Sequence, residues 1–415
     1  MSQWLEERLD LSRLRRKYFR KAFPVHHTYY LGELTLAAFI TLVLTGIFLS
    51  FNYEPSSALV QVAQQDLPAA YASILYIDSL PFGQVIRSIH HWSADVMIAA
   101  AFVHLLRILL TGSYKKPREL NWLVGLGLLG LSLVAVFTGY ALLDDAFAVT
   151  ATRIGYGIAG SIPWAGDWIA QVFFGGVYPT SHSLPRLYPL HILWFPLILM
   201  GLIGLHLLIM IKQKHTQAAY AERVAPHRIL GTPLAPHQVL VSASLYFIYL
   251  GTVSMIAGVL IAHPVQAFGP PGVTTPSVKP EWYFLWIFGL LQLIPSTWVV
   301  PLPGGGALGP EFLGGVLVPI LLAVAAVLLP FIDTRRSSLR YMELPSEHPR
   351  RTGGTLGLLA FFLVGTLAGY RGEVPLPLPV LWALLLGVPI LVCVVSAGML
   401  RRRGGAERRH DPVGR

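Results

Sequence analysis

The chain contains eight apolar runs, each about as long as a helix that crosses a lipid bilayer. Such a helix needs about twenty mainly apolar residues, because it rises about 1.5 Å per residue through a hydrocarbon core of about 30 Å. Hydrophobic residues make up 54% of the chain and charged residues only 13%, far below the roughly 25% of soluble domains. We therefore expect an all-α membrane protein with eight transmembrane helices, at residues 31–52, 86–111, 121–143, 187–212, 237–262, 312–333, 354–370 and 376–399.

The basic residues indicate how these helices are oriented. Eight spans place both termini on the same side, and most of the 31 lysines and arginines lie on that side, in the termini and short loops. This positive-inside pattern predicts cytoplasmic termini in the cell inner membrane, and it explains the net charge of +10 without nucleic-acid binding. Residues 1–30 contain no signal-peptide core, and we expect them to form a retained amphipathic segment on the membrane surface.

Long loops on the opposite side indicate a working face away from the cytoplasm. They cover residues 53–85, 144–186 and 263–311, and loops of this length are usually functional or contain short helices. A shorter apolar run at 282–300 is expected to be re-entrant or interfacial. The connection at 213–236 divides the chain into an N-terminal unit, 1–212, and a C-terminal four-helix region, 237–415.

Four histidines lie at matched spacings in the second and fourth spans. His90 and His104 are 14 residues apart, and His191 and His206 are 15 apart. Each spacing returns to nearly the same helix face after about 21–22 Å. Because the two spans run in the same direction, His90 can pair with His191 near the outer surface and His104 with His206 near the inner one.

Two stacked histidine pairs favour two low-spin haems within a bundle of the first four helices. Bis-histidine ligation leaves no open coordination position, which suits electron transfer. The pairs lie too far apart to form one tetrahedral zinc site. Since Cys393 is the only cysteine, neither an intrachain disulfide nor a CxxCH attachment is possible, and we expect two non-covalent b-type haems.

Arginines and glycines fit the same spacing. Arg87 precedes His90 by three residues and Arg107 follows His104 by three, so each is placed to bind haem propionates at its own membrane surface. Glycines allow backbone to approach a flat macrocycle. The candidates form two pairs, each 14 residues apart: Gly32 with Gly46, and Gly125 with Gly139.

Other interpretations of these residues remain open. A single intramembrane histidine is more often a hydrogen-bonding residue in helix packing, and His91 is expected to be one, with Asp95 one turn later as its partner. A transporter could use membrane-embedded Arg, His and Asp as a substrate or proton path. The haem-binding anchor of a membrane dehydrogenase would also carry paired histidines. An optical spectrum would separate the redox interpretation from the transporter.

Taken together, these motifs resemble the cytochrome b subunit of the quinol:cytochrome c oxidoreductase (cytochrome bc) family. The resemblance rests on RxxH at Arg87–His90, HxxR at His104–Arg107, the glycine pairs, and PEWY at 280–283. The N-terminal half is similar to the plastid type in RSIHHWSA, LTGSYKKPRELNW and the 15-residue spacing. The chain is nevertheless a fused form, because both halves lie in one polypeptide.

The resemblance implies a respiratory Q cycle. Quinol would be oxidised at the outer face near PEWY, one electron passing to a Rieske iron–sulfur protein and then to cytochrome c or a c-type cytochrome subunit. The other would cross both haems to an inner-face quinone, contributing to the proton gradient. Glu281 is the candidate proton acceptor, while Tyr283 and Tyr140 are candidates for positioning quinol and lining its pocket. The family also implies a homodimeric complex.

Two departures from the family pattern stand out. Tyr30 occupies the position where the plastid type attaches an extra haem through cysteine, so we expect no covalent haem on this chain. After the third span the family usually shows Gly-Tyr followed by Pro-Trp, whereas this chain continues from Gly139-Tyr140 to Asp144-Asp145. Near the inner haem, Lys212 and His215 are candidates for quinone protonation, or else simple topological anchors.

Overall fold

The computed structural model describes residues 22–213, 215–226, 228–260, 269–272, 279–303, 307–334 and 341–410, together with Trp4, Glu7, Arg8 and Ser12. The surface segment expected at residues 1–30 therefore lies largely outside the described residues.

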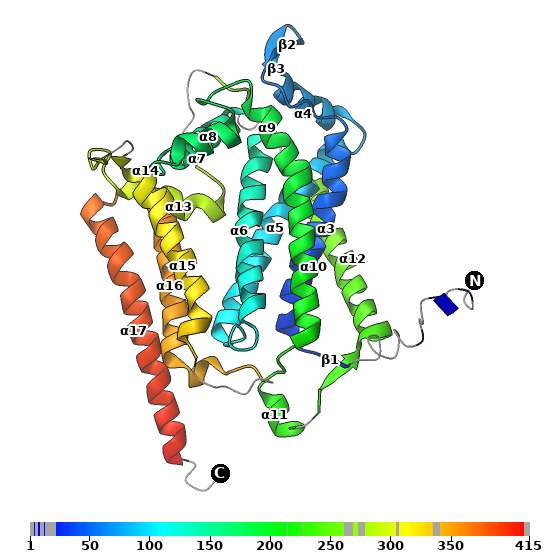
Figure 1. Cartoon of the computed structure of the whole chain (residues 1–415), viewed down its shortest axis with the longest axis vertical. Coiled ribbons are helices and arrows are strands. Elements are labelled where there is room, and N and C mark those ends of the chain that lie inside the picture. The colour runs from blue at the N-terminus through cyan, green and yellow to red at the C-terminus, as the bar shows by residue number, and fades with distance from the viewer. Residues whose placement is uncertain are drawn as a thin grey trace.

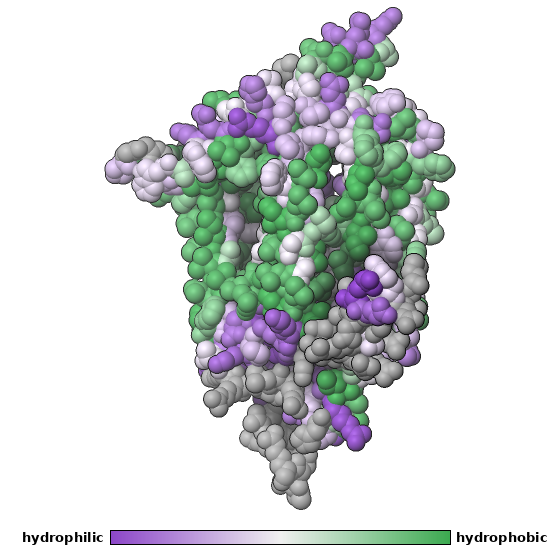
Figure 2. All heavy atoms as spheres, turned by 45° about the vertical axis from the view of Figure 1, so that its right-hand side comes forward, coloured by the Kyte–Doolittle hydropathy of each residue, from purple (hydrophilic) through white to green (hydrophobic). Residues whose placement is uncertain are grey.

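Eight helices of the described residues are long and apolar enough to cross a membrane, which confirms the expected all-α membrane fold. Figure 2 shows the consequence on one face, where a broad hydrophobic band lies between hydrophilic ends. The spans are His27–Ser50, Gly83–Leu110, Glu119–Ala141, Ser183–Gln213, Leu234–Leu260, Pro310–Ile332, Pro349–Ala368 and Leu378–Arg402.

The first four spans form the centre of the molecule (Figure 1). Helix α3 (Tyr30–Ser50) packs along α5 (Gly83–Leu110), and α6 (Glu119–Ala141) packs along α10 (Phe195–Gln213). Alanines on α3 and α5 are almost fully buried, among them Ala38 and Ala100, and such small residues let helix backbones approach closely. This bundle holds all four predicted haem ligands.

The fourth span is not a regular α-helix. It begins as α9 (Ser183–Pro189) and passes through a π-helical turn, η3 (Leu190–Trp194), before α10. The Phe195 N–H bonds the Leu190 carbonyl, five residues back, and Pro196 has no N–H with which to continue the α pattern. A π turn accommodates one extra residue, so the 15-residue spacing of His191 and His206 fits the same face as the 14-residue spacing on α5.

The C-terminal spans lie mostly beside the bundle. Helix α13 (Trp282–Leu293) is too short to span, as expected for the run at 282–300, and it shares a hydrophobic core with α16 (Pro349–Ala368) and α17 (Leu378–His410). Helix α15 (Val318–Ile332), preceded by α14 (Pro310–Phe312) and the π turn η7 (Leu313–Leu317), lies between them and α6. In contrast, α12 (Val239–Met255) packs on α3 and α5 and contributes Tyr249 and Val253 to the core of the bundle.

Short elements cover the two ends of the spans. One end carries α4 (Ala69–Ser79), α7 (Ala146–Gly160), α8 (Gly166–Phe174) and the hairpin of β2 (Leu59–Val62) and β3 (Gln65–Pro68). The loop at 144–186, one of those expected to be functional or to contain short helices, holds α7 and α8. The opposite end carries α11 (Tyr220–Val224) and the antiparallel pair β1 (Ala22–Pro24) and β4 (Gly231–Pro233). We call these the outer and inner ends.

The remaining short elements lie in the connections. They are η2 (His27–Tyr29), η4 (Leu234–Gln238), η5 (Ile256–Leu260), β5 (Val300–Pro301) paired with β6 (Ala307–Leu308), and η8 (Pro345–Glu347).

A candidate di-haem bundle and outer chamber

The structure brings His90 and His191 together inside the bundle. Their ring centroids are 6.3 Å apart, with 69° between the ring planes. Two nitrogen ligands about 2 Å from a shared metal ion put their ring centres roughly 6 Å apart, so the spacing of this pair fits coordination of one ion from two sides.

Hydrogen bonds orient both of these rings. The Nδ1 atom of His191 lies 2.9 Å from the Ala135 carbonyl oxygen, which can only accept, so Nδ1 carries the proton and Nε2 has a free lone pair. The Nδ1 atom of His90 lies 2.9 Å from the Thr45 hydroxyl. A second-shell partner on one ring nitrogen is the usual arrangement for histidines that ligate metal through the other.

His104 and His206 occupy the corresponding positions toward the inner end, on α5 and α10. Their buried Nδ1 atoms make no hydrogen bond within the described residues. Among those residues, no group of three or more His, Cys, Asp or Glu side chains is arranged to hold a bare metal ion, so the pairs do not form a zinc-type cluster.

Each of the four glycines lies against a different histidine ring. A Cβ atom would stand 3.5 Å from His104 Cε1 at Gly32, and 3.3 Å from His90 Cε1 at Gly46. At Gly125 it would stand 3.5 Å from His206 Cε1, and at Gly139 only 2.6 Å from His191 Cε1. The expectation was clearance for the macrocycle. In the structure, the glycines of α3 and α6 give space to the imidazoles, which are the candidate ligands themselves.

The two arginines have protein partners that the sequence did not reveal. Arg87 is buried and forms a bidentate ion pair with Asp78 at the end of α4, with Nε and NH2 at 2.6 and 2.7 Å from its oxygens. Arg107 lies over the Tyr29 ring, 4.8 Å from its centroid, and its Nε is 3.3 Å from the Thr28 hydroxyl. Asp78 lies in the last turn of α4, nine residues before Arg87, and an irregular connection separates the two helices, so the pair has no sequence signature.

A cavity of about 2680 Å³ opens beside the bundle. Side chains of α5, α6, α13, α15 and α16 line it, including Phe102, Leu133, Tyr283 and Trp286, most of them apolar. Cavities of this kind, with a few polar groups at one end, are typical sites for apolar ligands. Its outer end reaches the PEWY segment and its inner end reaches Tyr114 and Asp333.

Glu281 stands at the outer end, directly before the first turn of α13. Burial, and then the nearby charge of Asp95, raise its pKa to about 7. The Trp282 indole N–H donates to Asp95 Oδ1 at 2.9 Å, and His91 Nε2 lies 3.7 Å from Asp95 Oδ2. The expected neighbourhood of His91 and Asp95 is therefore present, and Trp282 adds a further partner.

The two candidate tyrosines gather at the same place. Burial and then the charges of Glu281 and Asp95 raise the pKa of Tyr283, and Tyr140 also lies within electrostatic reach. Phe284 links them, with ring centroids 5.0 Å from Tyr283 and 6.3 Å from Tyr140. The sequence-predicted outer-site residues thus form one cluster.

At the inner end, His215 lies against aromatic rings. Its centroid is 4.4 Å from that of Phe23 and 5.2 Å from that of Tyr29. Burial and then the charges of Arg107 and Arg118 lower its pKa to about 3, and its buried Nε2 makes no hydrogen bond to a described residue. Lys212 is exposed instead.

Eight spans, with half-buried histidine pairs that lie against glycines in the four-helix bundle, define an integral membrane protein suited to haem. Residues 95–270 match the family described as cytochrome b (N-terminal)/b6/petB, and residues 269–349 match cytochrome b (C-terminal)/b6/petD. The chain belongs to the cytochrome b family, as its motifs indicated, and it binds b-type haem as a component of electron transport.

Curated relatives are similar in sequence to this chain over most of its length. A protein of Streptomyces coelicolor is 33% identical over 387 residues, covering 89% of this chain and 70% of its own. One of Mycobacterium tuberculosis is 31% identical over 398 residues, covering 90% and 70%. Both are named cytochrome bc1 complex cytochrome b subunit. A solved structure titled hyperthermophilic respiratory Complex III has the same fold, with a TM-score of 0.70 over 96% of this chain and 100% of its own, at 23% identity.

Proposed function

We propose that this chain is the cytochrome b subunit of a respiratory quinol:cytochrome c oxidoreductase of the bc1 type. Quinol would be oxidised at the outer end and quinone reduced at the inner end, in a Q cycle that contributes to the proton gradient. The observation that carries the proposal is the set of four glycine–histidine contacts. Two of them join α3 to α5 and two join α6 to the fourth span, one of each toward the outer end and one toward the inner end.

The donor set of the bundle fits two haems. His90 and His191 would hold the outer one, and His104 and His206 the inner one. When bound, the haems supply one-electron transfer across most of the hydrocarbon core. Arg87 would contribute positive charge near the outer propionates while remaining paired with Asp78, and Arg107, beside Tyr29 and Thr28, would do so at the inner end.

The outer end of the cavity, together with Glu281, Tyr283 and Tyr140, supplies the groups that quinol oxidation needs. We call this region the quinol chamber. A pKa of about 7 lets Glu281 accept a proton from a quinol hydroxyl near neutral pH, because a general base works best when its pKa lies close to the operating pH. Tyr283 and Tyr140 would position the ring, and the apolar lining would hold the isoprenoid tail and exclude water.

The inner quinone site is proposed beside His215. Its unpartnered Nε2 can donate to or accept from a quinone oxygen, while the aromatic rings of Phe23 and Tyr29 provide apolar walls. The exposed Lys212 fits a topological anchor better.

The relatives' printed names assign them to a bc1 complex, which supports a multi-subunit assembly for this chain. We propose a multi-subunit complex with a Rieske iron–sulfur protein and a cytochrome c or c-type cytochrome subunit, assembled as a homodimer in the cell inner membrane with both termini cytoplasmic. Within the chain, residues 1–212 would form the haem-binding unit, 213–236 the cytoplasmic connection and 237–415 the region with the chamber's outer wall. By packing, α12 belongs with the haem-binding unit.

Haem content tests the ligand assignment. Reduced-minus-oxidised spectra of the purified complex should give two b-type haems per chain, and His104→Ala should lose the inner one only. His91→Ala is the matched control, a neighbouring histidine that should lose neither. A single haem in the unaltered chain, or loss of a haem in His91→Ala with both retained in His90→Ala, would contradict the assignment.

A further inference from the structure

The turn after α6 holds two adjacent buried acids that the proposed mechanism does not use. Asp144 and Asp145 stand where the family pattern led us to expect an aromatic residue after proline, and they are 8% and 2% exposed. Asp145 has a structural role as the N-cap of α7, because its Oδ1 accepts from the Ala148 N–H at 2.7 Å. Asp144 has no such role, since its carboxylate makes no hydrogen bond or ion pair with a described residue.

Asp144 also adopts a backbone conformation that few residues tolerate. Its φ is +48°, in the left-handed region where asparagine and aspartate are the commonest residues after glycine. A buried carboxylate without a partner costs free energy, so neither packing nor hydrogen bonding accounts for an acid here. A buried carboxylate that carries this cost points to a function.

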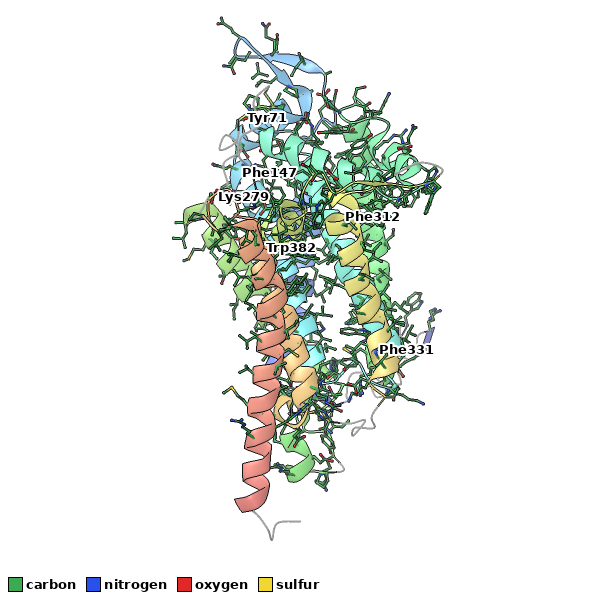
Figure 3. The ribbon with its side chains drawn as sticks, turned by 90° about the vertical axis from the view of Figure 1, so that its left-hand side faces the viewer. Tyr71, Phe147, Lys279, Phe312, Phe331 and Trp382 are labelled. Atoms are coloured by element: carbon green, nitrogen blue, oxygen red, sulfur yellow. The ribbon has the colours of Figure 1, made fainter. Side chains whose placement is uncertain are left out.

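Three contacts place this turn next to Tyr140, a proposed lining residue of the quinol chamber, and next to the loop that leads to Glu281. The Phe147 ring of α7 packs on Tyr140, with centroids 5.5 Å apart. The Leu143 N–H donates to the Tyr140 carbonyl at 3.1 Å. The Ala146 N–H donates to Gly269 at 3.1 Å, which lies in the loop leading to Glu281. Figure 3 labels Phe147 and Tyr71 near the outer end, above Trp382.

The surroundings of the pair favour a group that changes protonation near neutral pH. Burial and then the charge of Asp145 raise the pKa of Asp144 to about 7, and burial raises that of Asp145 to about 6. Arg87 acts on Asp145 in the opposite direction. The titratable and charged groups that act on the pair, or on which the pair acts, from other segments are Tyr53, Tyr71, Arg87 and Tyr178.

We propose that Asp144 is a proton-relay residue that carries protons from the quinol chamber to the outer aqueous phase. This inference rests on the proposed function. Quinol oxidation releases two electrons, which pass to the two acceptors of that function, and two protons. The Asp144 carboxylate takes up a proton leaving the chamber past Tyr140, becomes the neutral acid, and returns to carboxylate by releasing the proton to outer water. Nothing is oxidised or reduced at Asp144.

The test compares Asp144→Asn with Asp167→Asn in the complete purified complex. Asparagine keeps the shape of the side chain and tolerates positive φ, so it removes the titration alone, while Asp167 is an exposed acid of α8 at the same end. With Asp144→Asn, quinol oxidation at pH 8 should fall roughly tenfold or more, with b-haem spectra unchanged. The logarithm of the quinol oxidation rate should also rise less steeply between pH 6 and 8 than in the unaltered complex. Of Asp144 and Glu281, only Glu281 still titrates in this variant.

A second measurement follows the carboxyl group directly. Infrared spectra of the unaltered complex should show protonated carboxyl absorption that is lost between pH 6 and 8, from Asp144 and Glu281 together. In Asp144→Asn the Asp144 part of this band should be missing and the Glu281 part should remain. An Asp144→Asn complex with unaltered rate, pH profile and band overturns the proposal. If this variant does not assemble, Asp144→Glu decides. This variant keeps a carboxyl group on a side chain that is one methylene longer. It should therefore still oxidise quinol, with a shifted pH dependence of the rate, and an unshifted pH dependence overturns the relay.

The unaltered complex and Asp167→Asn separate this proposal from the function on which it rests. If neither oxidises quinol, the proposed function fails. If both do so and Asp144→Asn matches them, only the relay fails.

Discussion

Single glycines decide whether the histidine pairs can form. At Gly139 an added Cβ would stand 2.6 Å from the His191 ring, and that ring is fixed by the Ala135 carbonyl on its other nitrogen. The ring therefore has little freedom to move away. A single methyl group at this position acts directly on a candidate ligand, although it lies on a different helix.

Gly139→Ala should consequently impair the outer haem site. Overpacking a close contact typically costs about 1–3 kcal/mol, and here the strain displaces His191. We expect a reduced or shifted outer b-haem signal in the spectrum of the purified complex, with the inner signal retained. Gly127→Ala is the matched control on α6, because a Cβ there meets nothing within 4 Å. Equal spectra for the two variants would remove the proposed role of Gly139.

Glu281 gives the outer site a definite pH dependence. Its folded pKa is raised from 4.5 to about 7, so the carboxylate that can accept a proton predominates only above that pH. Quinol oxidation should therefore rise between about pH 6 and 8. Glu281→Gln should slow it by about a hundredfold at pH 8 and flatten this part of the profile, with both haem signals intact. Asp66→Asn, an exposed acid of β3, should keep the unaltered rate. Full activity in the glutamine variant would exclude Glu281 as the base.

At the scale of elements, a buried ion network joins the two halves of the chain at the inner end. Lys115, in the connection between α5 and α6, lies 3.0 Å from Glu343 and 3.3 Å from Asp333. Glu343 also pairs with Arg351 at the start of α16, and His348 lies 3.3 Å from it. The network connects the N-terminal bundle to α15 and α16 at the inner end of the large cavity.

Glu343→Gln should loosen this connection. The exposed fractions of the Glu343 and Lys115 side chains are both 7%, and removing one partner of a buried network leaves uncompensated charge, at a cost of about 3–5 kcal/mol. We expect a lower unfolding temperature of the purified complex. Glu347→Gln, four residues further along the chain and exposed, provides the comparison. An unfolding temperature equal to that of Glu347→Gln would show that the network contributes little.

At the scale of the whole molecule, the sequence predicted what depends on regular helices. The eight spans and the faces of His90 and His104 follow from 20-residue apolar runs and a fixed rotation per residue, and those features are local. Other features depend on irregular segments or on contacts distant in sequence: the Arg87–Asp78 pair, the approach of Lys115 to Glu343 and the π turn at His191. The spacing of residues along the chain carries no information about them. The 15-residue spacing was visible, but its cause, a π turn beside Pro196, required the backbone.

The orientation of the whole molecule remains a proposal that labelling can test. The outer end carries the exposed hairpin residue Asp66, and the inner end carries Val224 of α11, 71% exposed. With Cys393→Ser as background, Asp66→Cys should react with a membrane-impermeant maleimide in intact cells whose outer membrane, if present, is permeabilised. Val224→Cys should react only after the inner membrane is opened, because the basic loops hold that end in the cytoplasm. The reverse pattern would place the quinol chamber on the cytoplasmic side, and proton release there could not build the expected gradient.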